Sequence, residues 1–278
     1  MGQNDANGET VYPSVDRDAF RWAEKKAALA ETAVHVYGKY KAVCATDTRG
    51  HERPRGASKL DLLVDASEGF IPLWGKGVTL RWRFNQFSLE AFEQPDAAAA
   101  AVRLLLGKGV DQWGEGAPIK LAERDDAYDF EIAIREADRC SVNGCVLASA
   151  FFPDAGRHEL KIYPKFFELD EKEQVETMAH ELGHVFGLRH FFALVSETQW
   201  PSQIFGEHDA GKPFSIMNYG AASTMTDADR RDLKLLYEGV WRGDLKEING
   251  TPVRQVRPYH ETQEADRLVA LAALLRTG

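Results

Sequence analysis

Hydrophobic positions along the chain follow two spacings, and each spacing predicts one kind of element. Residues 77–84 alternate apolar and polar side chains, with Val78, Leu80, Trp82 and Phe84 on one face, as in a half-buried strand. Further strands are predicted over residues 61–65, 118–122, 128–134, 146–152 and 159–163. Apolar residues three to four positions apart instead predict helices over residues 14–42, 96–113, 170–186, 226–237 and 261–276.

Polar, turn-forming stretches separate these elements. Residues 44–60 read as a linker, and residues 191–214, which contain several glycines and prolines, read mostly as loop. With 278 residues and 44% hydrophobic content, the chain is long enough to bury one sizeable core and to carry extensions.

One stretch, HELGHVFGLRH from His180 to His190, combines residues that bind metal. His180 and His184 lie four residues apart and therefore on the same face of a helix, so their rings can reach one ion. Gly187 lets the chain leave the helix through a positive φ, which returns His190 as a third ligand. Three histidines with one open position are typical of a catalytic zinc, whereas structural zinc sites are closed by four ligands.

Glu181 distinguishes this interpretation from its alternatives. It lies about 100° round the helix from His180, near enough to serve a water held by the ion. The alternatives are a surface helix with solvated histidines and a metal site without catalysis. A purely structural site has no use for Glu181.

A second pattern lies downstream, where SIMNYG places Met217 some two dozen residues after His190. The two patterns together resemble the zinc signature and Met-turn of the metzincin metallopeptidases. The resemblance implies an α+β catalytic domain over residues 71–240, with a mixed, mostly parallel sheet, an active-site helix and a C-terminal helix. An N-terminal extension over residues 1–70 and a C-terminal helical tail over 241–278 would flank it. Phe191, directly after His190, matches no single subfamily.

The resemblance also implies a chemistry. One catalytic Zn²⁺, held by His180, His184 and His190, would activate water with Glu181 as the general base of a peptide hydrolysis. Met217 would lie beneath the metal, and Tyr219 would bind the metal or the oxyanion, or be an ordinary core tyrosine. Protein or peptide substrates would extend along the strand at 146–152, with the loop at 192–214 forming a pocket wall. The alternatives are a zinc amidase or deformylase-like hydrolase of small substrates and an inactive zinc-stabilised binding module.

Composition excludes some partners and leaves other questions open. A net charge of −9 argues against nucleic acid and anionic membranes as partners, and no apolar run approaches the length of a membrane span. No secretory signal is visible, so we expect a cytoplasmic protein or one exported by another route, monomeric by default. Cys44 invites a comparison with the latency cysteine of matrixins, although its surroundings differ. Cys140 and Cys145 would close a small loop in an oxidising compartment and remain thiols in a reducing one.

Overall fold

The computed structural model describes most of the chain. The described residues are 3–4, 10–23, 42–43, 62–65, 69–141, 144–190, 202–205, 215–217 and 223–264. The predicted linker at 44–60, Cys44 and Tyr219 lie outside them. Within the described helices, none is both long and apolar enough to cross a membrane.

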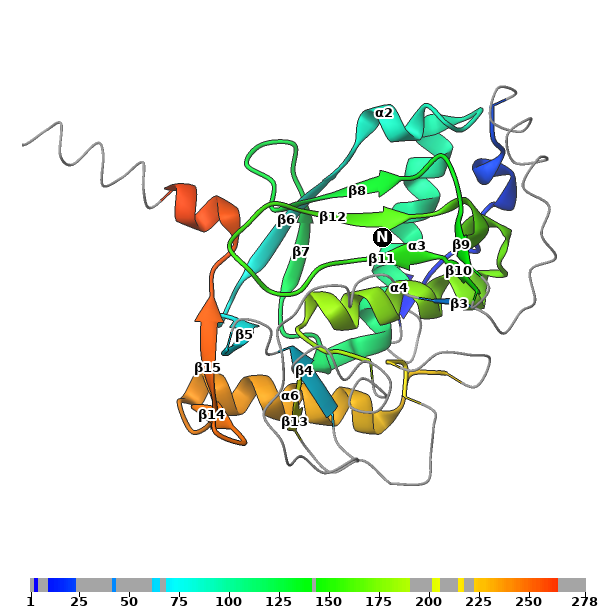
Figure 1. Ribbon diagram of the computed structural model, residues 1–278. Helices are drawn as coiled ribbons and strands as arrows, with labels where there is room; N and C mark the ends of the chain where they lie inside the picture. The colour runs from blue at the N-terminus through cyan, green and yellow to red at the C-terminus, as the bar shows by residue number, and fades with distance from the viewer. Residues whose placement is uncertain are drawn as a thin grey trace, which may run out of the picture.

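A five-stranded sheet forms the upper half of the molecule (Figure 1). Its strand order is β11-β12-β8-β6-β7, and the bounds are Ala148–Ser149, His158–Ile162, Phe130–Ile134, Thr79–Phe84 and Lys120–Glu123. All neighbours run parallel except β11, which is antiparallel to β12. The predicted mixed, mostly parallel sheet is therefore confirmed. Along β6 the apolar side chains are buried and the others half-buried, as their alternation predicts.

Two long helices, α3 (Pro95–Trp113) and α4 (Glu171–Val185), pack against each other beside this sheet (Figure 1). Gly109 makes their close approach possible, because a Cβ there would lie 2.9 Å from the Cβ of Met178. The contact also receives Trp113, which is fully buried and donates its indole N–H to the carbonyl of Ala179 at 2.9 Å. The crossing of the two helices thus fixes α4 from one side.

The lower half contains α6 and a small sheet (Figure 1). Helix α6 (Asp227–Arg242) is capped by Thr226, the first residue of the predicted helix, and extends five residues beyond the predicted end. The predicted C-terminal helical tail over 241–278 contains, before its predicted helix, a hairpin of β14 (Glu247–Ile248) and β15 (Thr251–Val256) that was not expected. Strand β15 pairs in parallel with β5 (Ile71–Trp74), a contact between distant parts of the chain that no local pattern indicates. Residues 259–264 are helical, in agreement with the start of the last predicted helix.

The N-terminal region differs from the prediction in its described part. A helix was expected over residues 14–42, but only a 3₁₀ turn, η1 (Arg17–Phe20), forms, and Trp22 then makes a β-bridge to Phe92. Aromatic contacts explain the difference: the Trp22 ring stacks on that of Phe92, with centroids 4.6 Å apart, and this requires an extended backbone. Residues 24–41 of the predicted helix lie outside the described residues.

Strand β4 (Leu62–Asp65) confirms the predicted strand at 61–65, and its neighbours place it near the end of α4. It pairs with β13 (Ser202–Phe205), a strand within the segment expected to be mostly loop, and Val64 bridges to Leu188. Val64 is fully buried. Although β4 belongs to the predicted N-terminal extension, it packs directly against the chain that follows the active-site helix.

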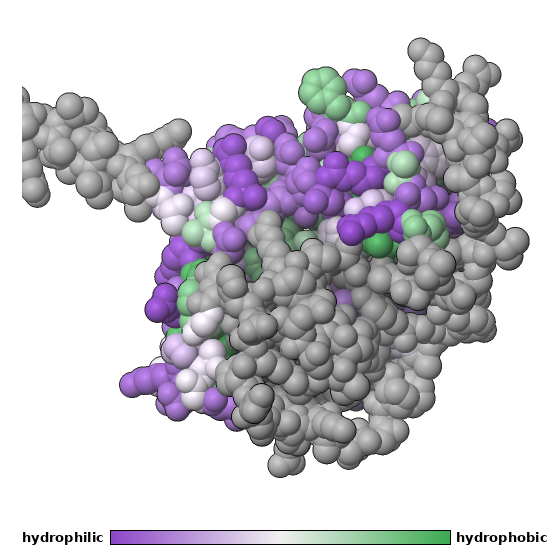
Figure 2. Space-filling model, viewed as in Figure 1, coloured by the Kyte–Doolittle hydropathy of each residue, from purple (hydrophilic) through white to green (hydrophobic). Residues whose placement is uncertain are grey.

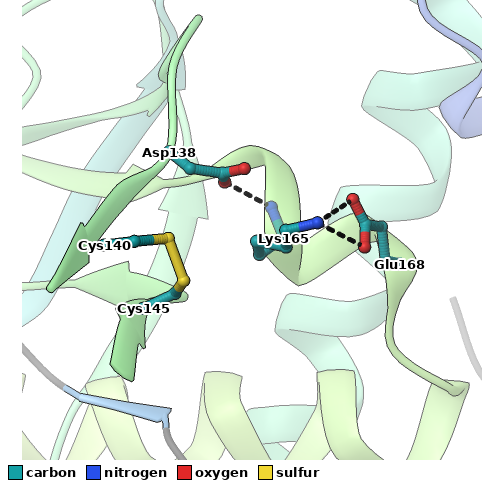
Figure 3. The surroundings of a disulfide bond; sticks show 5 residues. All are labelled: Asp138, Cys140, Cys145, Lys165 and Glu168. Atoms are coloured by element: carbon teal, nitrogen blue, oxygen red, sulfur yellow. Dashed lines mark hydrogen bonds and ion pairs between the residues drawn. A yellow bond between two sulfur atoms is a disulfide. The ribbon is translucent and has the colours of Figure 1, made fainter. Parts of the chain in front are cut away.

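A disulfide closes the small loop between β9 (Arg139–Ser141) and β10 (Gly144–Val146) (Figure 3). Cys140 and Cys145 face each other across the two antiparallel strands, so the sequence pattern CSVNGC forms a closed hairpin. On its other side β10 pairs in parallel with β3 (Ala42–Val43). The strand predicted at 146–152 is therefore divided into the end of β10 and the separate β11.

We expect replacement of both Cys140 and Cys145 by serine to lower the free energy of unfolding by about 2 kcal/mol, because the open loop regains conformational entropy in the unfolded chain. The corresponding fall in Tm is about 5 °C and can be measured by calorimetry. A reductant should lower the Tm of the native protein but not that of the double variant. Equal Tm values for the oxidised protein and the variant would contradict this account.

The start of α4 anchors the N-terminal segment through Glu171. Its carboxylate pairs with Lys108 and accepts the backbone N–H of Val15 at 2.9 Å, while Lys108 also donates to the carbonyl of Pro13 at 2.8 Å. The hydrogen bond from Lys108 is the main reason that the pKa of Glu171 lies below its usual range. Ionised Glu171 therefore stabilises this attachment above about pH 4.3, and the contribution is lost as the pH falls through the lowered pKa.

Hydrogen exchange of residues 12–23 should consequently accelerate below pH 4 more than exchange in the central sheet. The variant Glu171→Gln should exchange faster already at pH 7 and show a weaker pH dependence. If the segment exchanges at the same rate in both proteins at every pH, the anchor does not act as described.

Candidate metal centre

The local structure of α4 explains how its histidines are presented. Asp170 caps the helix by accepting the N–H of Glu173 at 2.9 Å, and the helix continues to Val185. It ends in a Schellman motif, in which the N–H of Gly187 bonds the carbonyl of His184 and the N–H of Leu188 bonds that of Gly183. Gly187 adopts φ 92°, the positive value expected from the sequence. The turn reverses the chain within three residues.

This reversal brings the three predicted histidines together. The Nε2 atom of His180 lies 3.3 Å from that of His190 and 3.2 Å from that of His184. A zinc ion with Zn–N distances of about 2.0–2.1 Å in tetrahedral geometry separates its nitrogen ligands by about 3.3 Å. Within the part of the chain that the structure describes, these histidines form a group with ligand atoms close enough to hold a metal ion. Their spacing fits zinc.

Hydrogen bonds on the opposite ring nitrogens fix the state of two histidines. The Nδ1 of His180 lies 2.7 Å from the carbonyl oxygen of Ile216, and the Nδ1 of His184 lies 2.7 Å from that of Leu188. A carbonyl can only accept, so Nδ1 carries the proton and Nε2 presents its lone pair to the centre of the cluster. Two lone pairs that face each other at this distance favour a cation between them.

The three histidines and Glu181 are buried, with His180 7%, Glu181 1%, and His184 and His190 0% exposed. Burial strengthens electrostatic interactions, because the effective dielectric constant is lower than in water. Glu181 follows His180 on the same helix, so a carboxylate and three imidazoles share one water-poor region. A Lewis acid and a proton acceptor can therefore act together here.

Comparisons with known proteins find likenesses among solved structures, of which myroilysin is an example. The chain is similar to the structure of myroilysin, with a TM-score of 0.39 and 13% sequence identity, over 63% of this chain and 98% of that one. No family model matches the sequence. No curated protein matches it either. A match with this TM-score and sequence identity assigns no activity to the chain. The histidine cluster and the order of the helices are what agree with the resemblance noted in the sequence.

The arrangement agrees with the fold and the three-histidine centre that the resemblance to metzincins led us to expect. An α+β fold with a mixed five-stranded sheet presents three histidines from an active-site helix and the turn that follows it, and a further helix, α6, lies below.

Met217 packs directly against this centre. It is 1% exposed, and a Cβ added to Gly183 would lie 2.3 Å from its sulfur. Residue 183, between Glu181 and His184, must therefore be a glycine, a requirement that the sequence analysis missed. The need for a glycine at position 183 becomes visible only when the structure shows that Met217 packs against the helix there. Tyr219, two residues further, lies outside the described residues and stays a prediction.

Asp229 holds the segment that orients His180, and the sequence analysis assigned it no role. Its Oδ1 accepts the hydroxyl of Ser215 at 2.6 Å, and its Oδ2 accepts the N–H of Ile216 at 3.3 Å. The same carboxylate accepts the N–H and hydroxyl of Thr226 at 2.9 and 2.7 Å. This fully buried side chain therefore connects the start of α6 to the carbonyl that bonds His180. The sequence shows only an ordinary capping pattern, TDAD.

The last carbonyls of α4 also have partners from distant elements. The indole of Trp74 donates to the carbonyl of Val185 at 2.7 Å, and the hydroxyl of Tyr237 donates to that of Phe186 at 3.0 Å. Complete burial raises the pKa of Tyr237 far above its usual value, so the hydroxyl remains a donor at any physiological pH. Strand β5 and helix α6 thereby secure the end of α4 that carries His184.

Phe152, from the segment predicted to bind substrate, lies beside the histidines. Its ring meets that of His184 edge-on, with centroids 5.6 Å apart, and the guanidinium of Arg189 lies 5.8 Å from the same ring. Strand β11, which precedes it, occupies one edge of the central sheet and lies against α4. The described structure thus brings the predicted substrate strand and the predicted metal ligands to the same place.

The variant Asp229→Asn should weaken zinc binding by about 10- to 100-fold, because a carboxamide can accept at only one of the two oxygen positions and the carbonyl of Ile216 loses its fixed position. Zinc affinity can be measured by competition with a chromogenic chelator. Asp227→Asn is the matched control, since that side chain on the same helix is fully exposed and should not affect affinity. If Asp229→Asn lowers the Tm but leaves zinc affinity unchanged, Asp229 stabilises the fold and does not position the metal ligands.

Proposed function

We propose that this protein is a zinc-dependent endopeptidase. The observation that carries the proposal is the convergence of three Nε2 atoms at separations that fit tetrahedral zinc, on a helix that also bears Glu181. Hydrogen bonds to the Nδ1 atoms of His180 and His184 support it, because they prepare both rings for metal binding. His190 supplies the third nitrogen, which leaves one position for water or substrate.

The reaction assigns a separate role to each side chain. The three histidines hold the ion, and a bound zinc would supply a Lewis acid for the water and for the scissile carbonyl. Glu181 accepts the proton of the attacking water and later transfers it to the leaving amine, which makes it both general base and general acid. Burial favours this proton transfer, because few other water molecules can reach a carboxylate that is 1% exposed.

The position of β11 supports an extended peptide as the substrate. This strand lies at the end of the strand order, so its outer edge can pair with the backbone of a peptide. Backbone pairing contributes affinity with little dependence on sequence, which is what an endopeptidase needs. Phe152 follows β11 in the chain and contacts the ring of His184, so this side chain is placed to contact a residue next to the cleaved bond.

Replacement of Glu181 by alanine should lower cleavage of casein and of a peptide library at least 10³-fold and leave one zinc per chain, since the carboxylate handles protons but does not bind the ion. His184→Ala should lose both zinc and activity. Glu176→Gln, one turn before His180 on the same helix, is the matched control and should retain both. A chelator should stop the native enzyme, and added zinc should restore it.

The outcome also separates the alternatives. A zinc amidase or deformylase-like enzyme would hydrolyse small N-acyl compounds and leave casein intact. An inactive zinc-stabilised module would bind one zinc and cleave neither substrate. Unchanged cleavage by Glu181→Ala would contradict the proposed mechanism.

A further inference from the structure

A second pocket lies at the amino-terminal ends of β8 and β12, and it shares no residue with the metal centre. It has a volume of about 290 Å³, near the lower end of the range for small-molecule sites. The residues around it come from β6, from the loops that lead into β8 and β12, and from the helical turn at 259–264. The charged or polar ones are Arg81, Asp126, Arg157, His260, Gln263 and Glu264. Hydrophilic residues are frequent on this part of the surface (Figure 2).

A buried carboxylate organises the wall of this pocket. Asp129 is 2% exposed and accepts the N–H of Arg81 at 2.7 Å, the N–H of His260 at 2.8 Å and the Nδ1 of His260 at 2.8 Å. These bonds attach the turn at 259–264 to the central sheet and determine the orientation of the imidazole. The proton of His260 is therefore on Nδ1. Its Nε2 has no hydrogen-bond partner among the described residues, although the residue is only 5% exposed.

Arg157 is held in place by aromatic rings and not by an acid. Its guanidinium lies 4.4 Å from the ring centre of Tyr128 and 4.5 Å from that of Tyr259. Over the described part of the chain it makes no ion pair and no side-chain hydrogen bond. Its five N–H donors thus remain available in a fixed plane, the arrangement that recognises a carboxylate through two parallel hydrogen bonds.

The other charges of the pocket decide what kind of anion fits. Arg81 is already paired with Glu264, with 3.2 Å between Nη1 and Oε1. Asp126 lines the same pocket as Arg157 and, within the described ranges, pairs with no cation. One available cation and one available carboxylate therefore remain, next to Ala127, which adopts φ 44°. A non-glycine residue in this conformation carries strain of the kind that binding sites maintain.

We propose that this pocket binds a small zwitterion, an amino acid or a compound of similar size. Its carboxylate pairs with the guanidinium of Arg157, its ammonium group pairs with Asp126, and the Nε2 of His260 bonds a polar group between them. A doubly charged phosphate fits less well, because Asp126 and Glu264 repel it. The site is independent of the proposed peptidase activity.

Calorimetric titration with ω-amino acids from glycine to 6-aminohexanoate tests the proposal, because these probes contain no peptide bond that the enzyme could cleave. Affinity should reach a maximum at one chain length, where both charges meet their partners. Propionate, propylamine and inorganic phosphate, each with one kind of charge, should bind at least tenfold more weakly. Binding should be the same for the zinc-loaded and the chelator-treated protein, which separates this pocket from the metal centre.

Variants identify the two contacts. Arg157→Gln and Asp126→Asn should each weaken binding of the best probe at least tenfold, whereas Arg139→Gln and Asp125→Asn, which alter exposed residues outside the pocket, should not. Arg157→Lys retains the charge but not the planar fork and should have intermediate affinity. Circular dichroism should show that all variants are folded. Absence of saturable binding by every ω-amino acid, phosphate binding that is tighter than zwitterion binding, or insensitivity to Arg157→Gln would overturn the proposal.

Discussion

The convergence of three imidazole lone pairs on one point is the constraint on which the rest of this structure depends. Nitrogens 3.2 and 3.3 Å apart repel each other without a cation, so the surrounding chain must hold them in place. Two carbonyls, those of Ile216 and Leu188, orient the rings, and neither belongs to a regular element. A metal site of this kind therefore requires two well-defined turns as much as it requires a helix.

Each of these turns is held by residues far away in the sequence. The turn after α4 depends on the positive φ of Gly187, on the bridge from Leu188 to Val64, and on Trp74 and Tyr237 at the helix end. The turn at 215–217 depends on Asp229, which also belongs to the capping box of α6. The small sheet, helix α6 and part of the N-terminal region thus all contribute to the position of the ligands. Burial makes these bonds effective, because an unsatisfied polar group would be costly there.

The two sites of the molecule use burial differently. At the metal centre, buried imidazoles face one another and a carboxylate is withdrawn from water, which suits proton transfer next to a cation. In the pocket beside β8, the buried Asp129 accepts hydrogen bonds from Arg81 and His260 and so fixes the pocket wall. The exposed charges of Arg157 and Asp126 can then interact with a ligand. The first arrangement favours chemistry, whereas the second favours recognition.

Local sequence determined the central helix, the exit at Gly187, the three histidines and most strands of the large sheet, because side-chain periodicity and glycine conformations act over a few residues. It did not reveal Gly183 facing Met217, the role of Asp229, or the pairing of β5 with β15, since each depends on residues that meet only after folding. The extended path of Trp22 shows the same limit, because contact with Phe92 outweighed a helical pattern. Local sequence thus specified which histidines are the candidate ligands, and long-range packing decided the orientation of their rings.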